Sequence, residues 1–230
     1  MIIPCMKALR HALAAGILIA AFGCSRSDSA DKQTYDGAST RSYLILVGQV
    51  RSQINSDNRE RIPAMIGGVD TVMLDNQASK LGVLKQSLSK FPTDNVDPDA
   101  VQFAQNIGGI IDLYQAACKD SAELYREVAR QDETIPGQKP RMPAIRAAMR
   151  AAPQADTLGA LAALADTVEH AGNSANPGFM SSAAMLQKLR DDHERLIAAK
   201  ESHHLFTIKV RSDFAQRYPG QDWNAKEILP

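Results

Sequence analysis

A four-three repeat of apolar and small residues is the strongest constraint on the fold of this chain. It follows Asp97-Pro98, which favours a helix start because Asp caps free backbone N–H groups and Pro fits the first turn. Alternating spacings of three and four residues are typical of helices packed side by side in a bundle or a short coiled coil. We therefore predict one helix of about 34 residues, about 50 Å long. Its buried seam is formed by Ala104, Ile107, Ile111, Tyr114, Cys118, Ser121, Tyr125 and Val128.

Apolar residues at helical spacing predict further helices in the rest of the chain. One begins near Ser39 and fades at residues 55–58, and a long one runs from Pro63 to Phe91. Two short helices are predicted at 144–151 and 156–170, and a final long helix at 179–214. Aromatic residues make up 5% of the chain, a composition that suits helices better than sheets. The predicted fold is an all-α, elongated helical bundle of about four to five helices, with 205–210 as the one segment that also fits a strand.

Two glycine pairs, Gly67-Gly68 and Gly108-Gly109, lie early in the predicted long helices. Each glycine costs about 1 kcal/mol of helix propensity relative to alanine. We interpret the pairs as places where two helices approach closely.

The first residues have the layout of a secretory signal. Lys7 and Arg10 precede the apolar run 12–22, which is shorter than the roughly 20 residues of a membrane-spanning helix. The sequence Ala21-Phe22-Gly23-Cys24 resembles the lipobox of bacterial lipoproteins. In that family the cysteine is linked to diacylglycerol and becomes the mature N-terminus. The resemblance implies a signal peptide at 1–23 and acyl chains such as palmitate on Cys24; an ordinary signal peptide that is cut elsewhere is the alternative.

The segment after Cys24 is polar and rich in Ser, Asp and Lys, which predicts a flexible tether at 24–37 and leaves 38–230 for the bundle domain. Ser25 follows the cysteine where an inner-membrane retention signal would have Asp. By resemblance to the sorting rule of bacteria with two membranes, we expect the outer membrane, with the domain in the periplasm. Met6 is an alternative start to Met1.

If Cys24 carries lipid, Cys118 is the one thiol of the domain, so no intramolecular disulfide is expected.

The net charge limits the expected partners. The 26 basic and 26 acidic residues cancel, which argues against a nucleic-acid partner. We expect contact with the membrane through the N-terminal lipid and with another envelope protein.

Three polar residues are candidates for a metal or haem site. Glu201 and His204 have a Glu-x-x-His spacing, of which di-iron bundles use two copies. His193 lies between Leu189 and Leu196 on an apolar stripe. A solvated polar patch and a hydrogen-bonded core histidine are the alternative interpretations, and no Cys-x-x-Cys-His motif for covalent haem is present.

Tyr114 and Tyr125 are candidates for lining a ligand slot, although tyrosines commonly span a core and its surface. Phosphate-loop, Gly-x-Ser-x-Gly and His-Glu-x-x-His motifs are missing from the sequence. We predict no catalytic residue and no cofactor. The sequence thus favours a non-enzymatic envelope lipoprotein, whose bundle is a protein-interaction or spacer module; the alternative is a small-ligand or metal/haem-binding bundle.

Overall fold

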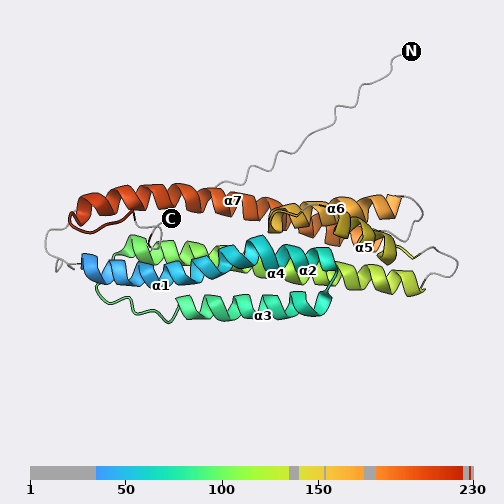
Figure 1. Ribbon diagram of the computed structural model, residues 1–230, viewed down its shortest axis with the longest axis horizontal. Coiled ribbons are helices and arrows are strands. Elements are labelled where there is room, and N and C mark those ends of the chain that lie inside the picture. The colour runs from blue at the N-terminus through green and yellow to red at the C-terminus, as the bar shows by residue number, and fades with distance from the viewer. Residues whose placement is uncertain (1–34, 135–139, 153, 174–179, 225–227, 229–230) are drawn as a thin grey trace, which may run out of the picture. The chain divides into compact units, whose positions relative to one another are not determined.

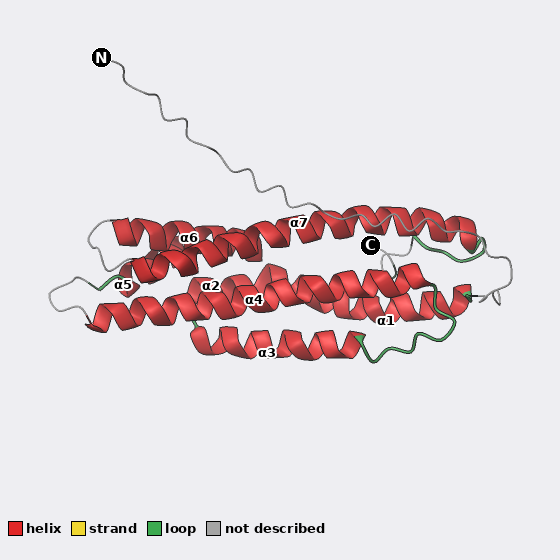
Figure 2. Ribbon diagram, turned by 180° about the vertical axis from the view of Figure 1, so that it is seen from behind, coloured by secondary structure: helices red, strands yellow, loops and turns green. Residues whose placement is uncertain are grey.

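The computed structural model describes residues 35–134, 140–152, 154–173, 180–224 and 228 (Figure 1). The predicted signal peptide and residues 24–34 of the predicted tether, Cys24 included, lie outside the described residues. Within the described ranges all regular elements are helical and none is a strand (Figure 2). In chain order they are α1 (Gly37–Ser56), a π-helical turn η1 (Asp57–Arg61), α2 (Ile62–Gly68), α3 (Thr71–Leu88), α4 (Pro98–Thr134), α5 (Met142–Ala151), α6 (Thr157–Asn173) and α7 (Met180–Arg217).

The predicted all-α, elongated bundle is confirmed. The seven α-helices of the described residues form six rods, because α1, η1 and α2 are continuous. Six rods exceed the predicted number of about four to five. The segment predicted at 63–91 is divided at Val69, but its first part is continuous with α1, so the division adds no rod. Residues 205–210 lie inside α7 and not in a strand.

Helix α4 is the central element of the bundle. It packs against the long helix α7 and the shorter helix α3, with α1 also in contact (Figures 1 and 2). Helices α4 and α7 are antiparallel: Asp97 at the start of α4 is ion-paired with Arg217 at the end of α7, and Gln131 near the end of α4 accepts a hydrogen bond from Ser182. The short helices α5 and α6 pack on α2, and α6 also contacts α7.

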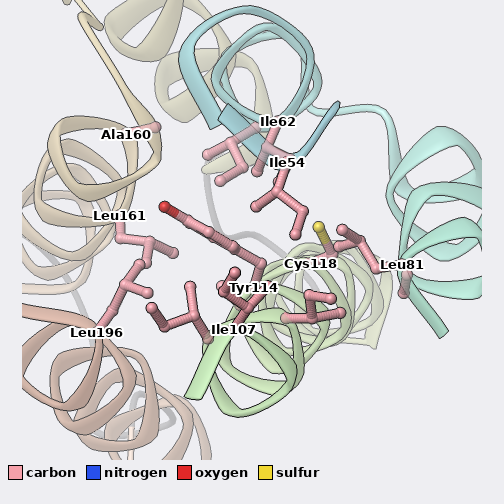
Figure 3. Close-up of a cluster of buried hydrophobic side chains, with 14 of the residues drawn as sticks. Ile54, Ile62, Leu81, Ile107, Tyr114, Cys118, Ala160, Leu161 and Leu196 are labelled. Carbon is pink, nitrogen blue, oxygen red and sulfur yellow. The ribbon is translucent and has the colours of Figure 1, made fainter. Parts of the chain in front are cut away.

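The seam predicted for the long helix is confirmed. All eight of its residues are buried, from Ala104 to Val128. Burial also extends to Phe103, Ile110 and Leu124, because neighbouring helices cover more than one face of α4. Figure 3 shows the ring of Tyr114 at the centre of the core, among side chains from α1, α2, α4, α6 and α7.

The predicted helix boundaries between 55 and 91 are wrong. The helix does not stop at 55–58, because Asp57 and Asn58 are buried with polar partners: Asp57 accepts from Gln77 Nε2 (2.8 Å), and the Asn58 carbonyl accepts from the Thr157 hydroxyl (3.1 Å). The real break comes at Val69, whose φ of 57° is left-handed.

The next helix, α3, starts where Asp70 accepts a hydrogen bond from the Met73 N–H (3.0 Å). Met73, which a continuous helical spacing from Val69 would place on an apolar stripe, is 43% exposed, and its neighbour Leu74 is buried instead.

A buried carboxylate joins three helices at one end of the bundle. Asp97 accepts hydrogen bonds from Arg217 (2.6 Å) on α7, from the Tyr218 hydroxyl (2.7 Å) and from the Asp99 N–H (2.9 Å). Its own N–H donates to Thr40 Oγ1 (3.0 Å) on α1. The Asp97-Pro98 helix start predicted from sequence is therefore confirmed, and it also fixes the ends of α1 and α7.

No helix among the described residues is long and apolar enough to span a membrane.

Candidate functional site

The candidate metal ligands His193, Glu201 and His204 are all on α7. The two histidines are separated by about 16 Å along the helix axis, at 1.5 Å per residue. His193 is half-buried, and Glu201 and His204 are exposed. In the described part of the chain, no group of three or more His, Cys, Asp or Glu side chains is placed to hold a metal ion. The structure does not bring these three residues together as one site.

Tyr114 and His204 share a cavity of about 140 Å³ between α1, α4 and α7. Tyr125 is not part of its lining: it is buried elsewhere, with its hydroxyl donating to the Ile66 carbonyl oxygen (2.6 Å). The two candidate tyrosines therefore do not line one slot. The cavity is lined by Arg51, Ile54, Asn55, Ile107, Ile110, Tyr114, Lys200, His203, His204 and Thr207.

His203 is a buried histidine that the sequence analysis missed. Its ring packs on Phe103 with a centroid distance of 4.8 Å, and neither ring nitrogen has a hydrogen-bond partner among the described residues. Burial, together with the charges of Arg51 and His204, lowers the pKa of His203 to about 4. The imidazole is therefore neutral at neutral pH. An unsatisfied buried polar group of this kind costs about 1–3 kcal/mol of stability.

A pair of buried carboxyl groups lies between α4 and α7. Asp120 accepts a hydrogen bond from Lys188 Nζ (2.6 Å), and Asp192 lies beside it; both aspartates are buried. Burial raises the pKa of Asp192 to about 7, and hydrogen bonding to Asp120 and its negative charge act in the same direction, against the opposing charges of Arg195 and Lys188. A neutral Asp192 can donate to the Asp120 carboxylate while Lys188 balances the charge.

The carboxylate of Asp57, in the π-helical turn, also affects the one thiol of the domain. Burial, and then the charge of Asp57, raise the pKa of Cys118 to about 12. Since the thiolate is the reactive form, this fully buried cysteine remains a protonated core side chain.

A larger cavity, of about 480 Å³, opens between α3 and α4 beside α1. Its volume lies in the range of sites that bind small molecules, roughly 300–1,000 Å³. Lys85 on α3 and Asp112 on α4 form an ion pair at its edge, with an Nζ–Oδ2 distance of 2.5 Å. We take this cavity as the candidate functional site. It is lined by Tyr43, Lys85, Leu88, Ser89, Phe91, Thr93, Val101, Ala104, Gln105, Gly108, Gly109 and Asp112.

The interpretation of the glycine pairs as close helix contacts is wrong for Gly108-Gly109. A Cβ atom on Gly109 would meet nothing within 4 Å, and one on Gly108 would meet only Lys85 Cε at 4.0 Å. These glycines leave space that belongs to the cavity. In the other pair, Gly67 does lie close to a neighbour, since its Cβ would come within 2.8 Å of the Gln154 side chain, but Gly68 does not.

The buried carboxyl group of Asp192 had a signal in the sequence. Asp192 lies three residues after Leu189 and four before Leu196, so it fits the apolar stripe as well as His193 does, and the structure buries Asp192. The pair Gly108-Gly109 was the signal of the cavity in the sequence, but its meaning depends on the neighbouring helices, which leave space beside it.

Replacing His203 with Phe should stabilise the bundle. His203→Phe keeps the ring against Phe103 and removes two buried nitrogens without partners, so we expect a gain of about 1–2 kcal/mol at pH 7. The unfolded chain takes up a proton near pH 6.5, whereas folded His203 does so only near pH 4, so wild-type stability is lost as the pH falls through this window. Urea unfolding at pH 7 and pH 5 should show a larger gain at pH 5. The exposed neighbour His204→Gln is the control, and an unchanged or lower stability of His203→Phe would contradict the prediction.

Replacing Asp192 with Asn should change the pH dependence in the opposite direction. Folded Asp192 keeps its proton up to about pH 7, whereas the unfolded side chain loses it near its usual pKa of 3.8. Wild-type stability therefore falls as the pH rises from about 4 to 7. Asp192→Asn imitates the protonated form and should be more stable than wild type at pH 8, by about 1–2 kcal/mol, with little difference at pH 4.5. Asp191→Asn is the control; a difference between Asp192→Asn and wild type that does not vary with pH would show that Asp192 is ionised in the folded protein.

Comparisons with protein-family models, with curated proteins and with solved structures gave no match to this chain. Its function is therefore inferred from the residues and their geometry.

Proposed function

We propose that this chain is a non-enzymatic lipoprotein of the bacterial cell envelope, with its helical bundle acting as a protein-interaction or spacer module. In this proposal a lipid on Cys24 holds the protein at the membrane. Ser25 favours the outer membrane, with the bundle in the periplasm. The partner is another envelope protein.

The observation that supports a tethered bundle is the way its first helix begins. Asp36 lies 12 residues after Cys24 and caps α1 by accepting hydrogen bonds from Ala38 N–H and Ser39 N–H. The Asp36 N–H donates to the Asn95 carbonyl oxygen (2.9 Å) in the connection that leads into α4. A 12-residue segment spans at most about 40 Å when extended. The bundle is thus fixed at the point where the proposed tether enters it, which suits a spacer.

Exposed apolar side chains on α7 support a role in protein interaction. Leu205 and Ile208 are 67% and 52% exposed and lie one turn apart, and Ile197 is 37% exposed. Residues 197 and 208 are separated by 11 positions, which returns nearly to the same face of a helix. Apolar side chains that gather on one face are characteristic of interaction sites, whereas isolated ones are not.

Small-ligand binding is the second candidate function, favoured by the 480 Å³ cavity between α3 and α4. The metal and haem form of this alternative has no comparable support in the described residues, where His193, Glu201 and His204 do not converge.

Lipidation at Cys24 is testable by labelling. Cells that express the wild-type chain and are fed labelled palmitate should yield a labelled protein, because the lipobox cysteine would carry the acyl chains. Cys24→Ser should remove the label completely. Cys118→Ser is the matched control, since Cys118 is buried in the domain and should leave labelling unchanged. An unlabelled wild type, or a labelled Cys24→Ser variant, would exclude the proposed anchor.

The interaction role is testable on α7. The double variant Leu205→Glu/Ile208→Glu should lose the partner that co-purifies with wild type from native membranes, because charges would replace the exposed apolar contact. Its melting temperature should stay within a few degrees of wild type, as expected for surface substitutions. The control is Ala183→Glu/Ala184→Glu, at two exposed positions about 33 Å away along α7. If both double variants retain the same partner, this face of α7 is not the interaction surface.

A further inference from the structure

We propose that the cavity between α3 and α4 binds a single-chain carboxylic acid, with its alkyl chain over Gly108 and Gly109 and its carboxylate at Lys85. The inference rests on the second candidate function, small-ligand binding. It is independent of the lipid anchor and of the α7 surface, so its failure leaves those two proposals standing.

The lining of the cavity matches an alkyl chain. Tyr43 from α1, Phe91 after α3 and Val101 from α4 contribute apolar surface, and the Tyr43 and Phe91 rings meet edge to face at a centroid distance of 6.4 Å. Leu88 and Ala104 extend this surface. Apolar walls with a small number of polar groups are typical of sites for small apolar or amphiphilic ligands.

The two glycines make room for the chain. Neither is needed for helix packing, because added Cβ atoms would meet only Lys85 Cε at 4.0 Å. Each glycine nevertheless weakens the interior of α4, where alanine or leucine would form helix more readily. The pair of glycines therefore leaves open space in the cavity, and a larger side chain at Gly109 would fill it.

The ion pair at the edge of the cavity limits the width of a ligand. Lys85 and Asp112 bridge α3 and α4 at 2.5 Å, beside the glycines. An α-helix with its side chains is about 10–12 Å wide, so a partner helix could not reach Gly108 without breaking this bridge. An alkyl chain is thin enough to lie beside it.

The same ion pair provides the site for a carboxylate. Among the residues that line the cavity Lys85 is the cation, and both side chains of the pair are about half-exposed: 46% for Lys85 and 48% for Asp112. Exposed ion pairs are weak, so an incoming carboxylate can compete with Asp112 for Lys85. The site thus has an apolar floor and a cation that is available at its edge.

The test uses residues 24–230 with Cys24→Ser, which retains the whole described bundle and needs no detergent. Binding of the neutral fluorophore N-phenylnaphthylamine is measured first, and then its displacement by dodecanoic acid. Gly109→Leu should weaken both by about tenfold or more, while its melting temperature stays equal or rises. Gly68→Leu is the matched control, since a Cβ there also meets nothing within 4 Å but lies in α2, away from the cavity lining. It should bind like wild type.

The head-group assignment is tested by variants of the ion pair. Asp112→Asn frees Lys85 from its partner and should tighten binding of dodecanoic acid by about threefold to tenfold, whereas Lys85→Gln should weaken it by a similar factor. The neutral analogue dodecanol should show neither change.

Three results would overturn the proposal: no fluorophore binding by folded wild type, equal binding by Gly109→Leu and Gly68→Leu, or equal effects of the ion-pair variants on the acid and the alcohol. Loss of binding in Gly109→Leu alone, with the opposite effects of Asp112→Asn and Lys85→Gln on the acid, would establish it.

Discussion

Burial of α4 on more than one face is the constraint on which the rest of this structure depends. A helix with one apolar stripe can lie on the surface of a bundle, but α4 also buries Phe103, Ile110 and Leu124 outside its predicted seam. It must therefore be covered by several helices, and α3, α7 and α1 cover it. The same arrangement provides partners for the polar start of α4, since Asp97 accepts hydrogen bonds from Arg217 and Tyr218 at the end of α7.

Because α4 is enclosed by other helices, several polar residues lie inside the bundle. The partners of each residue determine its charge and its structural role. Asp97 accepts several hydrogen bonds and links the start of α4 to the end of α7. Asp192 faces another carboxyl group, and His203 has no partner for its ring nitrogens among the described residues, so both are kept neutral by burial. These two groups oppose each other over the same pH range, because acidification removes the repulsion at Asp192 and forces a charge onto His203. Asp192 and His203 therefore contribute opposite slopes to the dependence of stability on pH below about 7.

The helical class and the long seam could be predicted from the sequence because both follow from periodicity along one element. The break at Val69 could not, since it depends on a left-handed residue without glycine and on the Asp70 cap. That error placed Met73 on a false core face, whereas the structure buries Leu74. Asp192 and His193 show a related limit: both fit the stripe between Leu189 and Leu196, and only packing against α4 decides which one is buried.

The glycines of α4 show why a local interpretation needs its spatial context. Glycine in a helix can permit a close contact or leave a space, and the two cases have the same sequence pattern. At Gly67 the neighbouring Gln154 occupies the position of a side chain, whereas at Gly109 that position is empty. Substitution would therefore require the Gln154 side chain to move at the first, and should favour helix formation at the second. At Gly109 a larger residue would strengthen the helix but would fill the cavity. Helix packing therefore does not explain why glycine is present there, and the space between α3 and α4 offers an explanation.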